Sequence, residues 1–299
     1  MAGGQSEKPI VFEYLFKQRL DHATGDFVTS TITNSELQEA IATLRGDLGL
    51  TLSVSNPANF LKDWLRMDTR NEQWPDLLRQ GRYTARQAFG KGAVFDFVPY
   101  APGQAEPFPD NFTLPADANI HVVEAVSLSS AARALGRADE SWLIQVSVHQ
   151  RVLQTHFAIY SDLDVIDLFH LQNTLKGPTE VDAVFLLILR ATAGLKKALV
   201  TFEAKMNDPI LPDQIRNQVA YMAKRCASEP ALSDVELIVP VAAASRAKQY
   251  GKGVIGVFEM EPIPVSEGAA AYDNKTQHHL TLTISKAIGY QFSPPVAGI

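Results

Sequence analysis

The sequence contains one cysteine, Cys226, and no long hydrophobic run. A single cysteine excludes an intramolecular disulfide framework and is typical of a reducing compartment, so we expect a cytoplasmic protein. No apolar stretch approaches the roughly 18 residues that a membrane-spanning helix needs, and the polar residues 1–9 do not have the pattern of a signal peptide. With 46% hydrophobic and 20% charged residues, the chain has the composition of a soluble globular protein.

The sequence also lacks an excess of positive charge. It has 27 lysine and arginine residues against 33 aspartate and glutamate residues, which gives a formal net charge of −6. A protein that simply coats nucleic acid is normally basic, so the composition counts against that class. An enzyme that acts on nucleic acid is still allowed, because metal-binding carboxylates add negative charge while a local basic face meets the phosphates.

Several familiar motifs are missing as well. The chain has no Gly-rich phosphate loop of the Walker type, no Gly-x-Ser-x-Gly nucleophile elbow, no Cys-x-x-Cys pair and no internal repeat. Four prolines fall between residues 101 and 119, in a polar, acidic stretch with little sign of regular structure. We therefore predict a linker there and two domains, an N-terminal module over residues 1–118 and a C-terminal domain over residues 119–299.

The N-terminal module is predicted to be mostly helical. Alternating apolar and polar residues over 10–33, around a turn at 23–26, predict a hairpin. The further elements that we expect are a helix over 35–45 capped by Ser35, a helix from 56, a helix over 74–79 and a strand over 93–100. Several short helices followed by a strand are similar to a winged-helix-like DNA-binding module.

The C-terminal domain is predicted to be of the α/β (α+β) class. The elements that we expect are a strand over 121–126, a helix over 129–136, two strands within 142–160, strands over 181–189 and 198–204, a helix from 212, and strands over 235–242, 253–260 and 280–284. His170 lies among apolar neighbours and is interpreted as structural. Because adjacent residues of a strand point to opposite sides, His278 and His279 are not expected to share a metal.

Charged residues cluster at the ends of two of these predicted strands. Asp182 opens one strand, and Glu203 and Lys205 close the next. The short glycine-containing link between the strands predicts an antiparallel hairpin, in which Glu203 and Lys205 share a face with Thr201. Ionised groups at the end of a buried strand need a charged partner or a bound cation, so the cluster is either a metal site or an ion pair that caps the strand.

The order of these parts resembles the catalytic core of the PD-(D/E)XK nuclease superfamily, which has the restriction-endonuclease-like fold. An acidic residue on one strand and Glu-x-Lys on the next are followed by a glutamine-bearing helix and a further strand, over residues 178–241. The resemblance implies a mixed central sheet flanked by helices. It also implies that Asp182, Glu203 and Lys205 are the catalytic residues.

Phosphodiester hydrolysis needs an activated water and compensation for the charge that develops on the phosphate, and a divalent cation provides both. We expect Mg²⁺, with Asp182, Glu203 and the Ala204 carbonyl as its ligands. Lys205 would orient or deprotonate the water, or stabilise the phosphate. The residues expected to support this site are Glu180, Gln214 and Gln218.

A basic stretch in the N-terminal module is a candidate for DNA contact. It runs from residue 79 to 91 and contains four basic residues, two glutamines and no acidic residue. Arginine and glutamine are suited to bidentate contacts with guanine and adenine edges. The residues expected to contact DNA are Arg79, Arg82, Arg86, Gln87 and Lys91. A solvated loop with no partner is the alternative, and the cations of residues 243–252 are a second candidate surface.

Taken together, the sequence predicts a Mg²⁺-dependent DNA endonuclease of the type II restriction class, which recognises a short duplex sequence. Because cutting both strands of a palindrome calls for two active sites, we expect a homodimer on double-stranded DNA. A structure-specific or repair nuclease of the same fold is one alternative. Others are a non-catalytic DNA-binding protein with a degenerate nuclease core and a non-catalytic α/β interaction protein.

Overall fold

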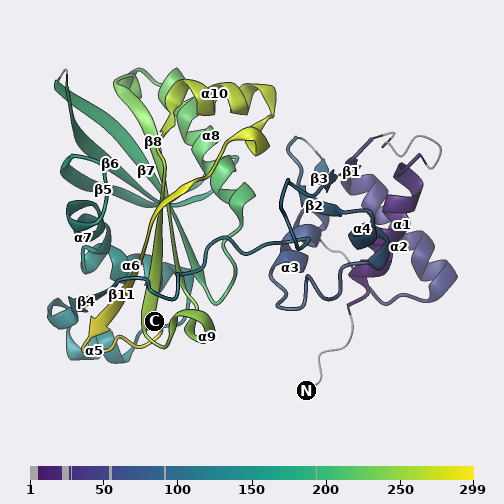
Figure 1. Cartoon of the computed structure of the whole chain (residues 1–299), viewed down its shortest axis with the longest axis horizontal. Helices are drawn as coiled ribbons and strands as arrows, with labels where there is room; N and C mark the ends of the chain where they lie inside the picture. The colour runs from purple at the N-terminus through teal and green to yellow at the C-terminus, as the bar shows by residue number, and fades with distance from the viewer. Residues whose placement is uncertain (1–5, 22–26, 28, 54–55, 91, 193) are drawn as a thin grey trace. The chain divides into compact units, whose positions relative to one another are not determined.

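The computed structural model describes residues 6–21, 27, 29–53, 56–90, 92–192 and 194–299. The chain divides into two compact units, residues 1–109 and 110–299, which Figure 1 colours from purple to blue and from teal to yellow. The division falls within the proline-rich stretch. Among the described residues, no helix has both the length and the apolar character needed to cross a membrane.

The N-terminal unit packs helices against a small antiparallel sheet (Figure 1). Its described elements are α1 (Lys8–Arg19), β1 (Thr31–Thr33), α2 (Asn34–Leu48), η1 (Pro57–Asn59), α3 (Phe60–Leu65), α4 (Asp76–Gln80), β2 (Tyr83–Gln87) and β3 (Ala93–Pro99). Strand β3 lies between β1 and β2 and pairs antiparallel with both. The buried aromatic side chains of its core include Phe12, Phe16, Phe60, Trp64, Trp74, Phe95 and Phe97. Because aromatic rings bury large apolar areas, they dominate the packing of this unit.

Residues 10–16 belong to helix α1, so the predicted hairpin is wrong. The buried side chains of α1 are Val11, Phe12, Leu15 and Phe16. They recur at a spacing of three to four residues, which places them on one helical face against the core. Pro9 lies in the first turn, where a helix has no need of its N–H. The predicted turn at 23–26 lies outside the described residues.

Helix α2 is capped by Thr33 and not by Ser35. The Thr33 hydroxyl accepts a hydrogen bond from the Glu36 backbone N–H, and the Glu36 carboxylate accepts one from the Thr33 N–H at 2.8 Å. This reciprocal capping box satisfies two N–H groups that have no partner within the helix. The helix ends at Gly49, whose φ of +69° lies in the left-handed region that favours glycine.

The C-terminal unit is a mixed sheet with helices on both faces (Figure 1). Its described strands are β4 (Ile120–Glu124), β5 (Val165–Leu175), β6 (Val181–Ala191), β7 (Gly194–Met206), β8 (Val235–Ser245), β9 (Val254–Met260), β10 (Ile263–Pro264) and β11 (Ile284–Ser293). Its described helices are η2 (Ala125–Ser127), α5 (Ser130–Ala134), α6 (Glu140–His149), α7 (Val152–Ile159), α8 (Pro212–Ser228), η3 (Pro230–Leu232), α9 (Ala247–Tyr250), α10 (Val265–Asn274) and η4 (Gln277–His279). The strand order is β4-β11-β9-β8-β7-β6-β5, with β10 beside β8.

Residues 142–160 form helices α6 and α7, so the two strands predicted there are wrong. Asp139 caps α6 by accepting the Trp142 backbone N–H at 2.8 Å. The side chains that the two helices bury include Leu143, Ile144, Val146, Val152, Leu153, His156 and Phe157. Their spacing of three to four residues is helical. The chain does turn at Gln150 and Arg151 as predicted, and Arg151 adopts a left-handed φ of 52° there.

Helices cover the two faces of this sheet with two separate cores. Side chains of α6 and α7 pack on the face that carries Phe202 of β7 and Val241 of β8. Side chains of α8 and α10 pack on the opposite face, against Leu199 of β7 and Ala242 of β8. Strand β7 is antiparallel to β6 and parallel to β8, and α8 makes the connection from β7 to β8. A parallel neighbour requires such a crossover.

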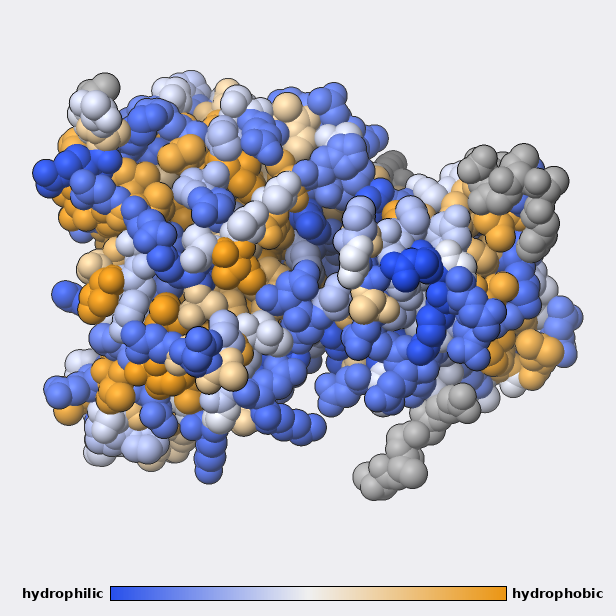
Figure 2. Space-filling model, in the orientation of Figure 1, coloured by the Kyte–Doolittle hydropathy of each residue, from blue (hydrophilic) through white to orange (hydrophobic). Residues whose placement is uncertain are grey.

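The edge strand β5 is largely exposed on both faces. Its exposed apolar side chains are Ile166, Phe169 and Leu171. Figure 2 shows hydrophobic patches over the part of the C-terminal unit where Figure 1 draws β5 and β6. His170 packs its ring 5.0 Å from the ring of Phe185 and contacts Asn173, so its contacts within the chain are those of a structural residue. Two register shifts interrupt the pairing of β5 with β6, as is common on strands at a sheet edge.

Candidate active site

The β6–β7 pair and the α8 crossover bring the predicted catalytic residues together. Asp182 is at the beginning of β6, and Glu203 and Lys205 are at the end of β7. Because β6 and β7 are antiparallel, with Ala183 paired to Phe202, these positions meet at one end of the sheet. The N-terminal end of α8 comes to the same end, since the helix follows β7 after a short loop.

The carboxyl groups of Asp182 and Glu203 lie within hydrogen-bonding reach of each other. Asp182 Oδ2 also accepts the Ala204 backbone N–H at 2.8 Å, which ties it to β7. Glu203 is fully buried, and its Oε1 forms an ion pair with the Lys205 ammonium. The ion pair expected as an alternative is therefore present, but it leaves a second, half-buried carboxyl group, that of Asp182, beside it.

Gln218 supports this cluster from α8. Its side-chain nitrogen donates to Glu203 Oε2 and to the backbone carbonyl of Glu180 at 3.1 Å. Gln218 is fully buried, as is Glu203. The Glu180 side chain is exposed, so the link to this residue runs through its backbone. Among the described residues, no hydrogen bond joins the Gln214 side chain to the cluster.

The electrostatics of the cluster follow from burial and from close charges. Burial raises the pKa of Asp182, against the lowering effects of the Ala204 N–H and Lys205. Burial also raises the pKa of Glu203 to about 7, and the nearby Asp182 adds to that increase. Burial disfavours the Lys205 ammonium, but Glu203 and Asp182 outweigh it and the pKa of Lys205 is raised. Near neutral pH the lysine is therefore charged, and the Glu203 carboxyl group holds a proton part of the time.

Sequence reasoning missed one acidic residue near the cluster, Glu140. It stands in the first turn of α6, and its charge contributes to the raised pKa of Lys205. The strands predicted within 142–160 exclude the helix that begins at this residue. The signal was Asp139, an N-cap residue directly before an apolar segment with helical spacing.

Four of the five residues predicted to contact DNA already make interactions within the chain, and the fifth lies outside the described residues. Arg79 donates to the Asn71, Glu72 and Trp74 carbonyls. Arg82 donates to the Gln104 carbonyl at 2.8 Å, and its guanidinium lies 5.0 Å from the centroid of the Tyr100 ring. Arg86 contacts Asp96 at 3.4 Å, and Gln87 also has an interaction within the chain. Lys91 lies outside the described residues.

On the second candidate surface, the cations of residues 243–252, at least one cation also has a partner within the C-terminal unit. Within residues 243–252, Arg246 is buried and forms an ion pair with Asp110. Lys252 is exposed. His278 and His279 lie in the short helix η4 and not before a strand, so the alternation argument made for them does not apply.

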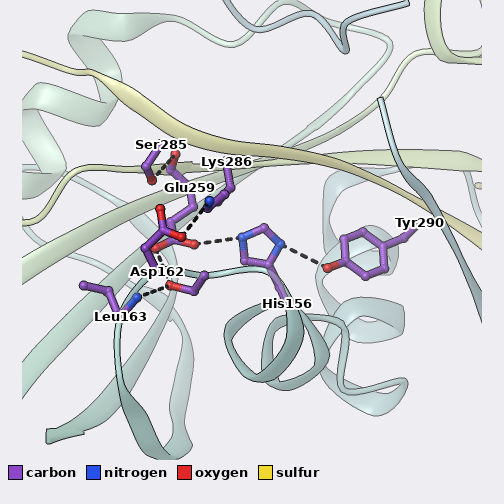
Figure 3. A network of polar contacts seen from close by, with 8 residues as sticks. His156, Asp162, Leu163, Glu259, Ser285, Lys286 and Tyr290 are labelled. Atoms are coloured by element: carbon purple, nitrogen blue, oxygen red, sulfur yellow. Dashed lines mark hydrogen bonds and ion pairs between the residues drawn. The ribbon is translucent and has the colours of Figure 1, made fainter. Parts of the chain in front are cut away.

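A second buried polar cluster lies on the opposite face of the same sheet. Figure 3 shows His156 of α7 between Glu259 of β9 and Tyr290 of β11. The His156 Nε2 lies 3.0 Å from Glu259 Oε2, and its Nδ1 lies 3.0 Å from the Tyr290 hydroxyl. Ser161 donates to the other oxygen of Glu259 at 2.7 Å. With the imidazole protonated on Nε2, every side-chain polar group in this hydrogen-bonded series has a partner.

This second cluster is closed to substrates. His156 is 0% exposed, Glu259 2% and Tyr290 0%. Register places Phe202, Val241 and Glu259 side by side on one face, so Glu203 points to the other. Sequence reasoning did not single out any of these residues, because they come from three separate elements.

Comparisons with known proteins do not place the chain in a family. No protein-family model matches it, no curated protein matches it, and no solved structure matches it. Within the described parts of the chain, no group of three or more histidine, cysteine, aspartate and glutamate side chains is arranged to hold a metal ion. A metal at the candidate site would thus depend on the two carboxyl groups and on backbone or water ligands.

Proposed function

We propose that the protein is a Mg²⁺-dependent endodeoxyribonuclease with the restriction-endonuclease-like fold. The observation that carries the proposal is a pair of carboxyl groups, the half-buried Asp182 and the fully buried Glu203, held within hydrogen-bonding reach beside Lys205. Two carboxylates this close repel each other when both are ionised, and a bound cation removes that repulsion. The order of β6, β7, α8 and β8 is also the order on which the resemblance to the PD-(D/E)XK superfamily rests.

The donor set fits Mg²⁺, because this ion binds through one or two carboxylates and keeps several water ligands. Asp182, Glu203 and the Ala204 carbonyl would hold it. When bound, Mg²⁺ supplies Lewis acidity at the phosphate and lowers the pKa of a coordinated water. Both oxygens of Glu203 contact protein groups, so Glu203 would have to give up its contact with Lys205 to hold a metal ion. The Lys205 ammonium would then be available to stabilise the charge that develops on the phosphate.

The substrate in this proposal is double-stranded DNA, and the enzyme acts as a homodimer of the type II restriction class in the cytoplasm. The N-terminal unit supports the DNA assignment by its topology. Its order of helices and strands, with β3 between β1 and β2, is similar to that of a winged-helix-like module. In this proposal Arg82 and Arg86 would contact phosphates and Gln87 would read a base edge, and each would exchange an interaction within the chain for the DNA contact.

A second candidate is a non-catalytic DNA-binding protein with a degenerate nuclease core. The observation that favours it is the closed set of contacts around Glu203, whose two oxygens face Lys205 and Gln218. If these contacts persist in the presence of Mg²⁺, Glu203 is not a ligand. The cluster is then the ion pair that caps a strand.

The test is cleavage of plasmid DNA with Mg²⁺ and with EDTA. We expect discrete fragments with Mg²⁺ only, and no fragments from Lys205→Ala. The matched control is Lys224→Ala, which removes a half-exposed lysine of α8 that pairs with Asp273 of α10. Smeared products indicate a nuclease without sequence preference, and cutting of branched DNA alone indicates a structure-specific enzyme. DNA binding without any cutting supports the second candidate.

A further inference from the structure

Strand β5 forms one edge of the sheet in the C-terminal unit (Figure 1), and its outer side has no neighbouring strand among the described residues. The strand is 11 residues long and contains neither proline nor lysine, the residues that commonly keep an edge from pairing with another chain. Its exposed apolar side chains are Ile166 at 47%, Phe169 at 48% and Leu171 at 51%. A long apolar edge of this kind is a template for a further strand.

The two register shifts of β5 leave the middle of this edge regular. Each shift adds one extra residue, Ile166 and Leu171, and both of these residues are apolar and exposed. Between them, residues 167–170 pair with β6 without interruption. The centre of the strand therefore keeps a regular ladder, with an exposed apolar residue on each side of it.

The charges along the edge indicate which strand fits there. The acidic residues Asp162, Asp164 and Asp167 lie in the first part of the segment, and the exposed Lys176 follows its end. Asp162 and Asp164 remain mostly exposed beside their partners within the chain, so a further cation can reach them. A second β5 in antiparallel orientation brings the lysine of each copy beside the acidic end of the other. A parallel second β5 brings acidic residues beside acidic residues, which is destabilising.

We propose that β5 is the contact surface for a second copy of this chain, and that the two β5 strands pair antiparallel about a two-fold axis at residue 169 or 170. An axis at residue 169 places Lys176 beside Asp162 of the other copy, and an axis at residue 170 places it beside Asp164. Both positions lie within the regular run 167–170. Phe169 then lies on or next to the axis, close to its own counterpart, and cross-strand aromatic pairs stabilise a sheet. Because the same surface is used by both copies, the contact closes at a dimer.

This contact leaves the two candidate active sites separate. Leu175 of β5 pairs with Val181, next to Asp182, so the candidate site lies near the C-terminal end of β5. That end is five to six residues from the axis, which places the two sites roughly 35–40 Å apart at opposite ends of the joint sheet. In the proposed function, each site would act on its own stretch of DNA. The contact itself does not depend on catalysis, so it stands or falls independently of the nuclease proposal.

The first test is sedimentation equilibrium of the full chain over a concentration series, without DNA and without Mg²⁺. One edge contact is smaller than a standard protein interface, so we expect a dimer with a dissociation constant on the order of 10 µM. Phe169→Asp should weaken the dimer at least about tenfold, because it places two carboxylates opposite each other at the axis. The matched control is Val122→Asp, which adds the same charge to the other edge strand, β4, where Val122 is 56% exposed.

The control should keep the wild-type dissociation constant. A wild type that stays monomeric well above 10 µM overturns the proposal. So does a dimer that Phe169→Asp leaves intact or that Val122→Asp weakens to the same extent.

Cysteine cross-linking tests the orientation of the strands. The native Cys226 is buried, so a cysteine introduced on β5 is the accessible one. A residue at the axis faces its counterpart at a Cα distance of about 4.5–5.5 Å, which a disulfide can span. We expect a disulfide-linked dimer from Phe169→Cys or His170→Cys and none from Asn173→Cys, whose two copies are roughly 20–27 Å apart. Cross-linking at all three positions indicates parallel strands and overturns the antiparallel contact, and cross-linking at none of them removes β5 from the interface.

Discussion

The sheet of the C-terminal unit carries a buried polar cluster on each face, and the two clusters differ in how completely they are satisfied. On the α7 face, Glu259 and His156 belong to a series of hydrogen bonds in which every side-chain polar group has a partner. On the α8 face, the two acidic residues Glu203 and Asp182 have one nearby cation, the Lys205 ammonium. The first cluster is closed, whereas the second holds an excess of negative charge that a cation is suited to bind.

The difference separates a structural network from a candidate site. A buried network with all its hydrogen bonds made specifies one packing arrangement, here the docking of α7 on β9 and β11. A buried pair of acids with a raised pKa is destabilising in the absence of a ligand, so it is expected where function requires it. By the same criterion, the N-terminal arginines already have partners within their unit, and a contact with DNA would require them to exchange these partners.

The largest expected effect is on catalysis, at the acidic cluster. Replacing Asp182 with Ala should reduce cleavage by roughly 1,000-fold or more, as loss of a central charged group in an active site does. DNA affinity without metal should be retained or increased, because repulsion of the phosphates is relieved. Plasmid cleavage and duplex binding measure the two effects. Weaker binding together with partial unfolding would instead identify the cluster as a cap on the strand.

The closed cluster should respond in stability and not in catalysis. Replacing Glu259 with Ala leaves the His156 side chain buried without its acceptor, so we expect a loss of about 3–5 kcal/mol in the free energy of unfolding. Urea unfolding measures the loss. Cleavage per folded molecule should stay at the wild-type level. A fall in cleavage without a fall in stability would show that the two faces do not divide structure from function.

The pH dependence of stability gives the next effect. The pKa of Glu203 is about 7 in the folded protein against an ordinary value of 4.5, so between these values the folded state holds a proton that the unfolded state releases. The metal-free protein should therefore lose stability as pH rises through this window, by on the order of 3 kcal/mol. The raised pKa of Lys205 acts only above pH 10.5, outside the window.

Urea unfolding of the wild type and of Glu203→Gln, at several pH values across the same window, measures how much Glu203 contributes to the pH dependence of the free energy of unfolding. The Gln variant should lack the decline, because its amide does not titrate. Parallel curves for the two proteins would assign the decline to other groups.

The smallest expected effect concerns DNA recognition by the N-terminal unit. Losing a phosphate contact in Arg82→Ala should weaken binding to all sequences alike and reduce the salt slope by about one. The same holds for Arg86→Ala. Losing a base contact in Gln87→Ala should cost roughly 1–3 kcal/mol on the preferred site alone. Affinities for specific and scrambled duplexes across a salt series measure both, and three unchanged curves remove this stretch from the interface.

The elements that the sequence predicts best are those whose pattern has one physical explanation. The apolar runs of β6 and β7, joined by a short glycine-containing link, are compatible with little besides a hairpin, so Asp182, Glu203 and Lys205 were placed at one end of the sheet. The 10–16 segment and the α6–α7 segment were misassigned because their apolar residues fit a spacing of two as well as one of three to four. Tertiary packing decides between these periods.

The supporting parts of the site were harder to predict. The sequence indicates Gln214 and Gln218 equally, since they lie one turn apart on one face of the helix, and only the orientation of α8 shows that Gln218 reaches Glu203. Glu140 was missed because its helix was interpreted as a strand. The partners of the arginines could not be predicted, because a partner such as Asp96 lies on a different strand and pairing between strands cannot be read from a local pattern.

The measurement that tests the central claim most directly is a calorimetric titration of the metal-free protein with Mg²⁺, carried out on the wild type, Asp182→Ala and Glu259→Gln. We predict binding of about one ion per chain in the wild type, with release of protons because the metal displaces the proton that Glu203, with its pKa of about 7, holds part of the time. Binding should be lost in Asp182→Ala and kept in Glu259→Gln. An absence of binding in the wild type, or binding that survives in Asp182→Ala, would contradict the account.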